Sequence, residues 1–458
     1  MSHVIRNFRG ASRAGRAGQS IVVLFTLGIA GVGRADIADL SAPTLDRSLT
    51  RENFFDWVDF DPYDAAVSWP GSSPELADNH WTPYLGERFT YDENIFRLPS
   101  AGAVPNTAAI PVRHDEINTV SAGLDGNVTA SGQRLEVLGR VDDNRFVEHG
   151  NLDNVSANVQ ALFSWTLGPS LTGELGGAYE RSLTDFTDYY LVTHSFLFTK
   201  DIVTTRTVFG SAEWALGSHW QLVAEGRHTD TSQTSDPGDP FKGDTGTLRA
   251  AYITTAGTSL AVDYQYATGN YGLPLEVNGV PIDRDFREQT VRLEISSPLS
   301  ETLHLLANAG YLKHDYTQDP AYDFAGGVWD ASLVWHPGAK TELALAGSRS
   351  VYADIDAQTQ YFVSQSARVI AQWSPTAALK VEFDFSRDDQ HFIGPNEIAP
   401  TVNVPTHNLN YSERLSLAWS VSRPLQIVLS GRYADRHSNA PVLTYDDTLV
   451  SASVRARF

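Results

Sequence analysis

Apolar and polar residues alternate along much of this chain. Between Leu379 and Phe385 every odd position is apolar and every even position is charged, and residues 154–165 and 425–433 largely follow the same period of two. Because successive side chains of a β-strand point to opposite faces, this pattern predicts strands of about ten residues. Each predicted strand has one apolar face and one face that must contact water.

The predicted strands come in pairs that recur about every forty residues, as a repeat architecture would. In each pair the first strand ends in a bulky residue, a tight turn follows, and a second alternating strand leaves the turn. The residues that mark these turns are Trp165, Trp214, Tyr252, Ile295, Trp335, Trp373 and Trp419. Soluble propellers repeat at a similar length, but their middle strands are buried on both faces and give near-continuous apolar runs. The alternation therefore favours a membrane barrel.

The connections predict about eighteen strands. A turn near residues 126–132 adds an eighth short connection to the seven above. Longer connections are expected near residues 98–115, 147–152, 184–202, 231–243, 268–287, 316–324, 353–360, 391–407 and 438–444. We therefore expect an all-β fold for residues 81–458, a transmembrane antiparallel β-barrel with short periplasmic turns and longer extracellular loops.

The N-terminal region is typical of an exported protein. Residues 1–35 contain five Arg and no acid, with an apolar run from Ile21 to Val32 and small residues at 33 and 35. This pattern predicts a signal peptide that is cleaved after Ala35. Residues 36–80 combine aromatic and acidic residues and do not follow the repeat, so they are expected to form a flexible periplasmic tail, a plug or a docking segment for a periplasmic export partner.

The chain ends on an alternating strand. Val454, Ala456 and Phe458 share one face, and Arg455 and Arg457 share the other. A terminal Phe in phase with such a strand resembles the signal that the outer-membrane assembly machinery reads, so we expect that machinery as a partner and the bacterial outer membrane as the location.

Aromatic residues at the turn markers predict an interfacial girdle. An aromatic ring with a polar edge is favoured where the apolar layer meets lipid headgroups, including those of lipopolysaccharide. The expected girdle residues are Trp165, Trp214, Tyr252, Trp335, Trp373 and Trp419.

The amino-acid composition argues against several classes of function. The chain has no Cys, which excludes disulfides and thiolate metal sites, and its formal net charge of -21 argues against nucleic acid as a partner. Its 13 His are scattered, and neither a paired-His zinc motif nor a nucleophile elbow occurs. We therefore expect no enzyme, no resident metal and no cofactor.

The polar faces of the predicted strands carry both signs of charge, so a purely anion-selective or cation-selective pore is not required. The residues expected to line the lumen are Arg134, Glu136, Arg140, Glu174, Glu225, Arg227, Arg292, Glu294, Glu342, Lys380, Glu382, Asp384, Arg414, Arg432, Arg455 and Arg457. Loop aromatics could offer flat faces to sugar rings or could simply pack the loops together. These are Tyr189, Tyr190, Phe196, Phe198, Tyr271, Tyr322 and Phe324.

Short motifs resemble a known family. Residues 91–97 read Tyr-Asp-Glu-Asn-Ile-Phe-Arg, residues 165–169 read Trp-Thr-Leu-Gly-Pro, and residues 179–182 read Tyr-Glu-Arg-Ser. They are similar to motifs of the β-barrel porin family of exopolysaccharide biosynthesis loci, the EpsL-like outer-membrane proteins. The resemblance covers the chain from about residue 82 to its end, carries over no catalytic residue and does not extend to the acidic segment before residue 80.

Three functions remain open. The resemblance implies an outer-membrane channel that exports a secreted exopolysaccharide together with periplasmic and inner-membrane export components. The residues alone are equally compatible with a general or sugar-selective diffusion porin. A structural or adhesive barrel with a blocked lumen is the third possibility.

Overall fold

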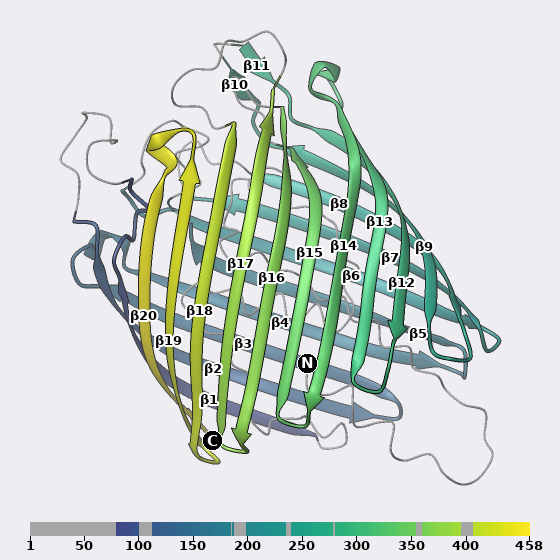
Figure 1. Ribbon diagram of the computed structural model, residues 1–458, viewed down its shortest axis with the longest axis horizontal. Helices are drawn as coiled ribbons and strands as arrows, with labels where there is room; N and C mark the ends of the chain where they lie inside the picture. Colours follow the sequence, from purple (N-terminus) through teal and green to yellow (C-terminus); the bar gives the residue numbers. More distant parts are fainter. Residues whose placement is uncertain are drawn as a thin grey trace.

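The computed structural model describes residues 79–99, 112–184, 186, 198–234, 240–277, 280–353, 360–394 and 406–458. Within this part of the chain, eighteen antiparallel strands form one closed sheet (Figure 1). Each strand pairs with the strands that precede and follow it, and β1 (His80–Asp92) pairs with β20 (Tyr445–Arg457) to close the ring. The expected all-β barrel is confirmed. The expected signal peptide and nearly all of the segment 36–80 lie outside the described residues.

The barrel strands follow the predicted hairpins. Between β1 and β20 they are β2 (Asp115–Ala130), β3 (Gln133–Phe146), β4 (Asn154–Leu167), β5 (Leu171–Leu183), β6 (Ile202–Leu216), β7 (Trp220–Gln233), β8 (Phe241–Ile253), β9 (Ser259–Tyr271), β12 (Phe286–Pro298), β13 (Leu303–Tyr316), β14 (Phe324–Gly338), β15 (Thr341–Ala353), β16 (Tyr361–Thr376), β17 (Leu379–Ile393), β18 (His407–Ser422) and β19 (Leu425–Ser438). A separate hairpin of β10 (Leu275–Val277) and β11 (Val280–Ile282) lies within a connection that the sequence analysis treated as loop.

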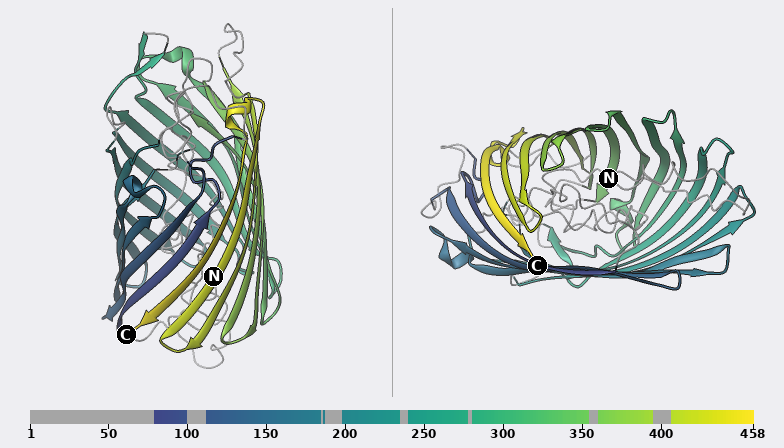
Figure 2. Two further views of the ribbon diagram at one scale, coloured as in Figure 1. Left: turned by 90° about the vertical axis from the view of Figure 1, so that its left-hand side faces the viewer. Right: turned by 90° about the horizontal axis from the view of Figure 1, so that it is seen from below.

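The two ends of the barrel differ in their connections. Eight short turns lie at one end, here called the turn end, and nine longer connections lie at the other, the loop end, in the predicted places. Ser131 and Gly132, which join β2 to β3, both have positive φ, as a two-residue hairpin turn requires. Short 3-10 helices at Gly150–Leu152, Pro320–Tyr322 and Pro441–Leu443 belong to the loop end. Seen from below, the strands form a flattened ring (Figure 2).

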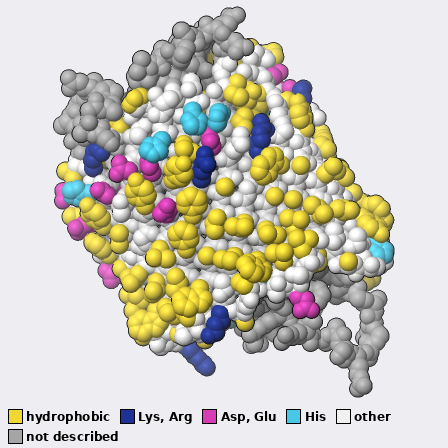
Figure 3. All heavy atoms as spheres, viewed as in Figure 1, with side chains coloured by type: hydrophobic (Ala, Val, Ile, Leu, Met, Phe, Trp, Pro, Cys, Tyr) yellow, Lys and Arg dark blue, Asp and Glu magenta, His cyan; other side chains and the backbone are white. Residues whose placement is uncertain are grey.

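Apolar side chains are spread over the strands on the face of the barrel that Figure 3 shows, with charged residues and His gathered on the upper part of that face. Alternation produces this surface, because Leu293 is 64% exposed whereas its neighbour Glu294 is 8% exposed. The described residues include no helix long and apolar enough to cross a membrane.

The first strand ends within the family-like motif. β1 ends at Asp92, so residues 93–97 of the Tyr-Asp-Glu-Asn-Ile-Phe-Arg motif form a turn after the strand. Arg97 there has a φ of 52°, which ends any extended conformation.

Candidate functional site

The residues expected in the lumen all lie on one side of the sheet. We call the strand face opposite the exposed apolar side chains the polar face. All sixteen of these residues are buried or partly buried on it: Arg134, Glu136, Arg140, Glu174, Glu225, Arg227, Arg292, Glu294, Glu342, Lys380, Glu382, Asp384, Arg414, Arg432, Arg455 and Arg457. Their shared burial follows from curvature, because side chains inside a closed sheet crowd one another while those outside spread apart.

One ion-pair network spans β8, β9 and β12. Arg249 is 8% exposed and contacts Glu294, and its Nε lies 3.6 Å from Oδ1 of Asp263. The network brings one expected residue, Glu294, together with two charged residues that the sequence analysis did not select. Buried charges require such partners, because an uncompensated charge in a poorly hydrated site is costly.

A second network spans β16, β17 and β18. Asp384 is 2% exposed, and its Oδ1 accepts a hydrogen bond of 2.8 Å from Nε of Arg368. The Asp384 carboxylate also lies 3.6 Å from Arg414, and Lys380 lies 3.6 Å from Glu382 on the same strand. Arg368 was not among the predicted lumen residues, although it holds the most buried acid of this group.

Other charged residues on the polar face have equally close partners. The contacts are Arg134 with Glu136, Arg140 with Asp142 at 2.8 Å, Arg227 with Glu225 at 3.5 Å, Arg292 with Gln265 at 3.3 Å, Glu174 with Ser164 at 3.3 Å, Glu342 with His336 at 2.9 Å, Arg432 with Asp447 at 3.4 Å, and Arg455 over the Tyr84 ring at 5.1 Å. Four of these contacts pair an Arg with an acid, whereas Gln265, Ser164 and the Tyr84 ring are neutral partners.

The family-like motif forms a buried clamp at the loop end. We name Asp92, Asn94, Arg97 and Asp447 the Arg97 clamp. Nη1 of Arg97 lies 3.1 Å from Asp92 and 3.0 Å from Asp447, so one guanidinium joins the end of β1 to the start of β20. The Asn94 amide donates to the carbonyl oxygens of Leu98 and Asp446, both at 2.9 Å. The clamp therefore fixes the turn after β1 against the seam that closes the barrel.

The clamp directs apolar residues into the loop end. Ile95, Phe96 and Leu98 are at most 2% exposed. The Phe96 ring packs edge-on against the rings of Phe186 and Phe198, with centroids 4.8 Å and 5.1 Å apart. Phe198 was one of the loop aromatics considered for sugar contact, and in the structure it packs loop against loop.

A second aromatic cluster occupies the loop end of β8 to β14. His314 stacks between Phe286 and Phe324, with ring centroids 4.4 Å and 4.6 Å away, and Tyr271 packs against Phe241 nearby. Of the remaining candidate sugar platforms, Tyr271 and Phe324 are therefore buried in packing and Tyr322 is packed against the cluster. Tyr189, Tyr190 and Phe196 lie outside the described residues.

The expected girdle residues lie on the apolar outer face, near the turn end. Trp214 and Trp373 are each 52% exposed, Trp419 is 48% exposed, and Trp335 and Tyr252 are exposed as well. Trp165 is only partly buried and lies across the strand pair from Gly173. All six lie on the outer-face phase of their strands, and their contact with lipid headgroups stays a prediction.

The chain terminus lies at the seam of the barrel. Phe458 is 73% exposed, and its backbone N–H donates to the carbonyl oxygen of Pro83 at 2.9 Å. Val454 lies opposite Glu87 and Ala456 opposite Leu85 in the β1–β20 pair. The residues expected to form an assembly signal are thus an accessible apolar row at the turn end.

A family model matches the second half of the chain. Residues 207–458, more than half of the sequence, match the model of a family described as "Putative beta-barrel porin 2". None of the curated proteins matches.

Solved structures of similar overall shape are distant in sequence. A BenF-like porin from Pseudomonas fluorescens Pf-5 is 11% identical, with a TM-score of 0.46 over 83% of this chain and 99% of that chain. OccK2 (OpdF) from Pseudomonas aeruginosa is 11% identical, with a TM-score of 0.44 over 82% and 98%. The siderophore receptor PirA from Pseudomonas aeruginosa is 10% identical, with a TM-score of 0.41 over 82% and 80%.

Proposed function

We propose that this chain, which belongs to the β-barrel porin family whose model matches residues 207–458, is a channel that exports a secreted exopolysaccharide across the outer membrane. The chain is a porin-like β-barrel of the bacterial outer membrane. The observation that carries the proposal is a closed ring of eighteen strands with a charged, polar face opposite its apolar outer surface. Barrels of 16–18 strands leave an aqueous channel, whereas eight strands are filled by side chains.

The sixteen residues of the polar face line this channel in our proposal. A neutral or weakly charged sugar chain needs hydrogen-bonding groups that do not trap it, and conduction requires binding weak enough to release. Ion pairs that satisfy one another, with amides such as Gln160 and Gln390 between them, provide such a wall. The exopolysaccharide as cargo is supported by the resemblance of residues 91–97 to the EpsL-like proteins.

The proposed orientation places the turn end in the periplasm and the loop end outside the cell. Short periplasmic turns and longer extracellular loops are the rule in bacterial barrels. The six aromatics near the turn end would then meet the headgroups of the inner leaflet, and lipopolysaccharide would surround the loop end. A segment 36–80 that precedes β1 would start from the periplasmic side, where export components could bind it.

Deletion of the gene tests the cargo. We expect loss of surface polysaccharide with unchanged uptake of small solutes. Unchanged surface polysaccharide with reduced solute uptake would instead identify a diffusion porin.

Conductance of the purified barrel in planar bilayers tests whether the lumen is open. We expect discrete conductance steps after insertion. Absence of current from correctly folded, inserted barrels would favour the blocked, structural barrel, for which the buried clusters around Phe96 and His314 at the loop end are the specific observation.

A further inference from the structure

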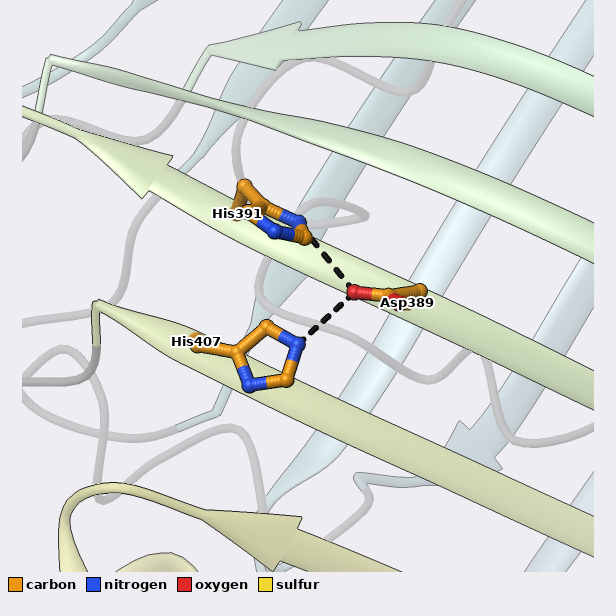
Figure 4. Close-up of side chains that lie close together, drawn as sticks. All are labelled: Asp389, His391 and His407. Atoms are coloured by element: carbon orange, nitrogen blue, oxygen red, sulfur yellow. Dashed lines mark hydrogen bonds and ion pairs between the residues drawn. The ribbon is translucent and has the colours of Figure 1, made fainter.

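Three side chains with metal-binding groups converge near the loop end of β17 and β18. They are Asp389, His391 and His407, and their ligand atoms lie within 4.8 Å of one another (Figure 4). Nδ1 of His391 lies 3.1 Å from Oδ1 of Asp389, and Nε2 of His407 lies 2.8 Å from the same oxygen. In the described part of the chain this is the one such group of three, and neither the family match nor the proposed channel explains it.

Strand geometry accounts for the convergence. Asp389 and His391 are two residues apart on β17, so their side chains leave the same face of the strand. His407 is the direct cross-strand partner of His391 in the β17–β18 pair. Directly opposite residues have Cβ atoms about 5 Å apart, which lets both imidazoles reach one carboxylate. All three residues belong to the outer face, because they share the phase of the exposed Phe383 and Leu415.

We propose that Asp389, His391 and His407 form a binding site for a zinc-like divalent cation on the outer face of the barrel. Zinc binds imidazole nitrogen and carboxylate oxygen at about 2.0–2.2 Å, so two tetrahedral ligands stand about 3.4 Å apart. Each imidazole nitrogen is already 2.8 Å or 3.1 Å from the carboxylate oxygen, and all three ligand atoms lie within 4.8 Å of one another, so a cation among them requires only small side-chain shifts. Calcium and magnesium are excluded as the preferred ions, because they favour oxygen ligands throughout.

The Arg387 guanidinium orients the Asp389 carboxylate. Nη2 of Arg387 lies 3.5 Å from Oδ2 of Asp389, which leaves Oδ1 facing the two imidazoles. Partners of this kind fix ligand orientation in metal sites. The site is also accessible, because the side chains of His391 and His407 are 54% and 42% exposed. Three protein ligands leave at least one position for water or for an external ligand.

Bound zinc would link β17 to β18 where the connection between Ile393 and His407 leaves the two strands. A ligand that binds only the folded state raises stability with its concentration, so zinc should delay unfolding of the barrel.

The test uses the full mature chain without a His tag, folded in detergent and titrated with zinc chloride by calorimetry. We expect one zinc ion per chain. His391→Ala, His407→Ala and Asp389→Asn should each lower the zinc affinity at least about tenfold, because removing a metal ligand should weaken binding more than removing a residue that only supports a ligand. His437→Ala is the matched control. It removes a similarly exposed His on neighbouring β19, 3.1 Å from Asp435, that belongs to no group of three ligand atoms among the described residues.

Cobalt absorption provides a second readout that needs no variant. Cobalt in a site with two imidazoles and a carboxylate should give intense visible bands of tetrahedral type, which zinc then abolishes. Equal zinc affinity in wild type, His407→Ala and His437→Ala would overturn the proposal. So would a wild-type barrel that binds no zinc and shows no tetrahedral cobalt spectrum. The result is independent of channel activity.

Discussion

At the scale of single residues, the Arg97 clamp is expected to contribute strongly to the free energy of unfolding. Asp92 and Asp447 have no exposed side-chain surface, and one guanidinium serves both. Arg97→Ala leaves Asp92 and Asp447 with Arg432, 3.4 Å from Asp447, as their remaining close cation, and we expect the free energy of unfolding to fall by about 3 kcal/mol. Urea unfolding of the detergent-folded barrel, followed by Trp fluorescence, measures the change.

The matched control is an exposed cation at the same end of the barrel. Arg145 pairs with Asp143 at 2.9 Å and with Asp153 at 3.2 Å, but its side chain is 60% exposed. Arg145→Ala should lower the free energy of unfolding far less than Arg97→Ala does, because solvent screens an exposed ion pair. Equal effects of the two substitutions would contradict the role given to the Arg97 clamp.

At the scale of strands, a glycine gives the girdle residue Trp165 its place. A Cβ added to Gly173 on β5 would lie 2.2 Å from the Trp165 ring and 2.3 Å from the carbonyl oxygen of Ser211. Gly173→Ala must displace either the ring or the β5–β6 pairing, so we expect a loss of about 1–3 kcal/mol of unfolding free energy. Gly226→Ala on β7 is the control, because a Cβ there meets nothing within 4 Å. If Gly173→Ala leaves the free energy of unfolding unchanged, the Trp165 ring is free to move.

The last strand allows folding and assembly to be separated. Phe458 is 73% exposed and its backbone bond to Pro83 does not need the ring, so Phe458→Ala should change the free energy of unfolding by only about 0.5 kcal/mol. If the ring is part of the assembly signal, the same substitution lowers the amount of heat-modifiable barrel in the outer membrane. Val421→Ala, another exposed apolar residue near the turn end, is the control. Unaltered membrane levels for Phe458→Ala would remove Phe458 from the signal.

Strands and turns were predictable from the sequence because their signals are local. Alternation and tight turns are read within a dozen residues, and all eight short turns lie where those signals placed them. Arg249 and Arg368 were missed because small residues beside them, such as Ala250 and Ala367, blur the alternation. The site at Asp389, His391 and His407 depends on strand register, which a scattered set of His does not reveal. Sequence spacing alone therefore indicated which residues share the polar face, but not which of them form ion pairs.

At the scale of the whole barrel, locally balanced charge has a measurable consequence for conduction. Because the polar face carries both signs of charge and many of these charges form close ion pairs, we expect an open channel to discriminate only weakly between cations and anions. Asp384→Asn removes the carboxylate shared by Arg368 and Arg414 and leaves excess positive charge on that wall. The reversal potential in a salt gradient should then shift toward anion selectivity.

The control for this shift is the same substitution on the other side of the sheet. Asp244 lies on the outer-face phase of β8, and its side chain is 71% exposed. Asp244→Asn changes the net charge of the barrel by the same amount, but the potential of a distant exposed charge is screened over about 10 Å at 0.1 M salt. A selectivity shift for Asp384→Asn and none for Asp244→Asn would mean that ions pass along the polar face. Both variants must still conduct for the comparison to count. If their reversal potentials shift equally, or if neither shifts, these ion pairs lie off the conduction path.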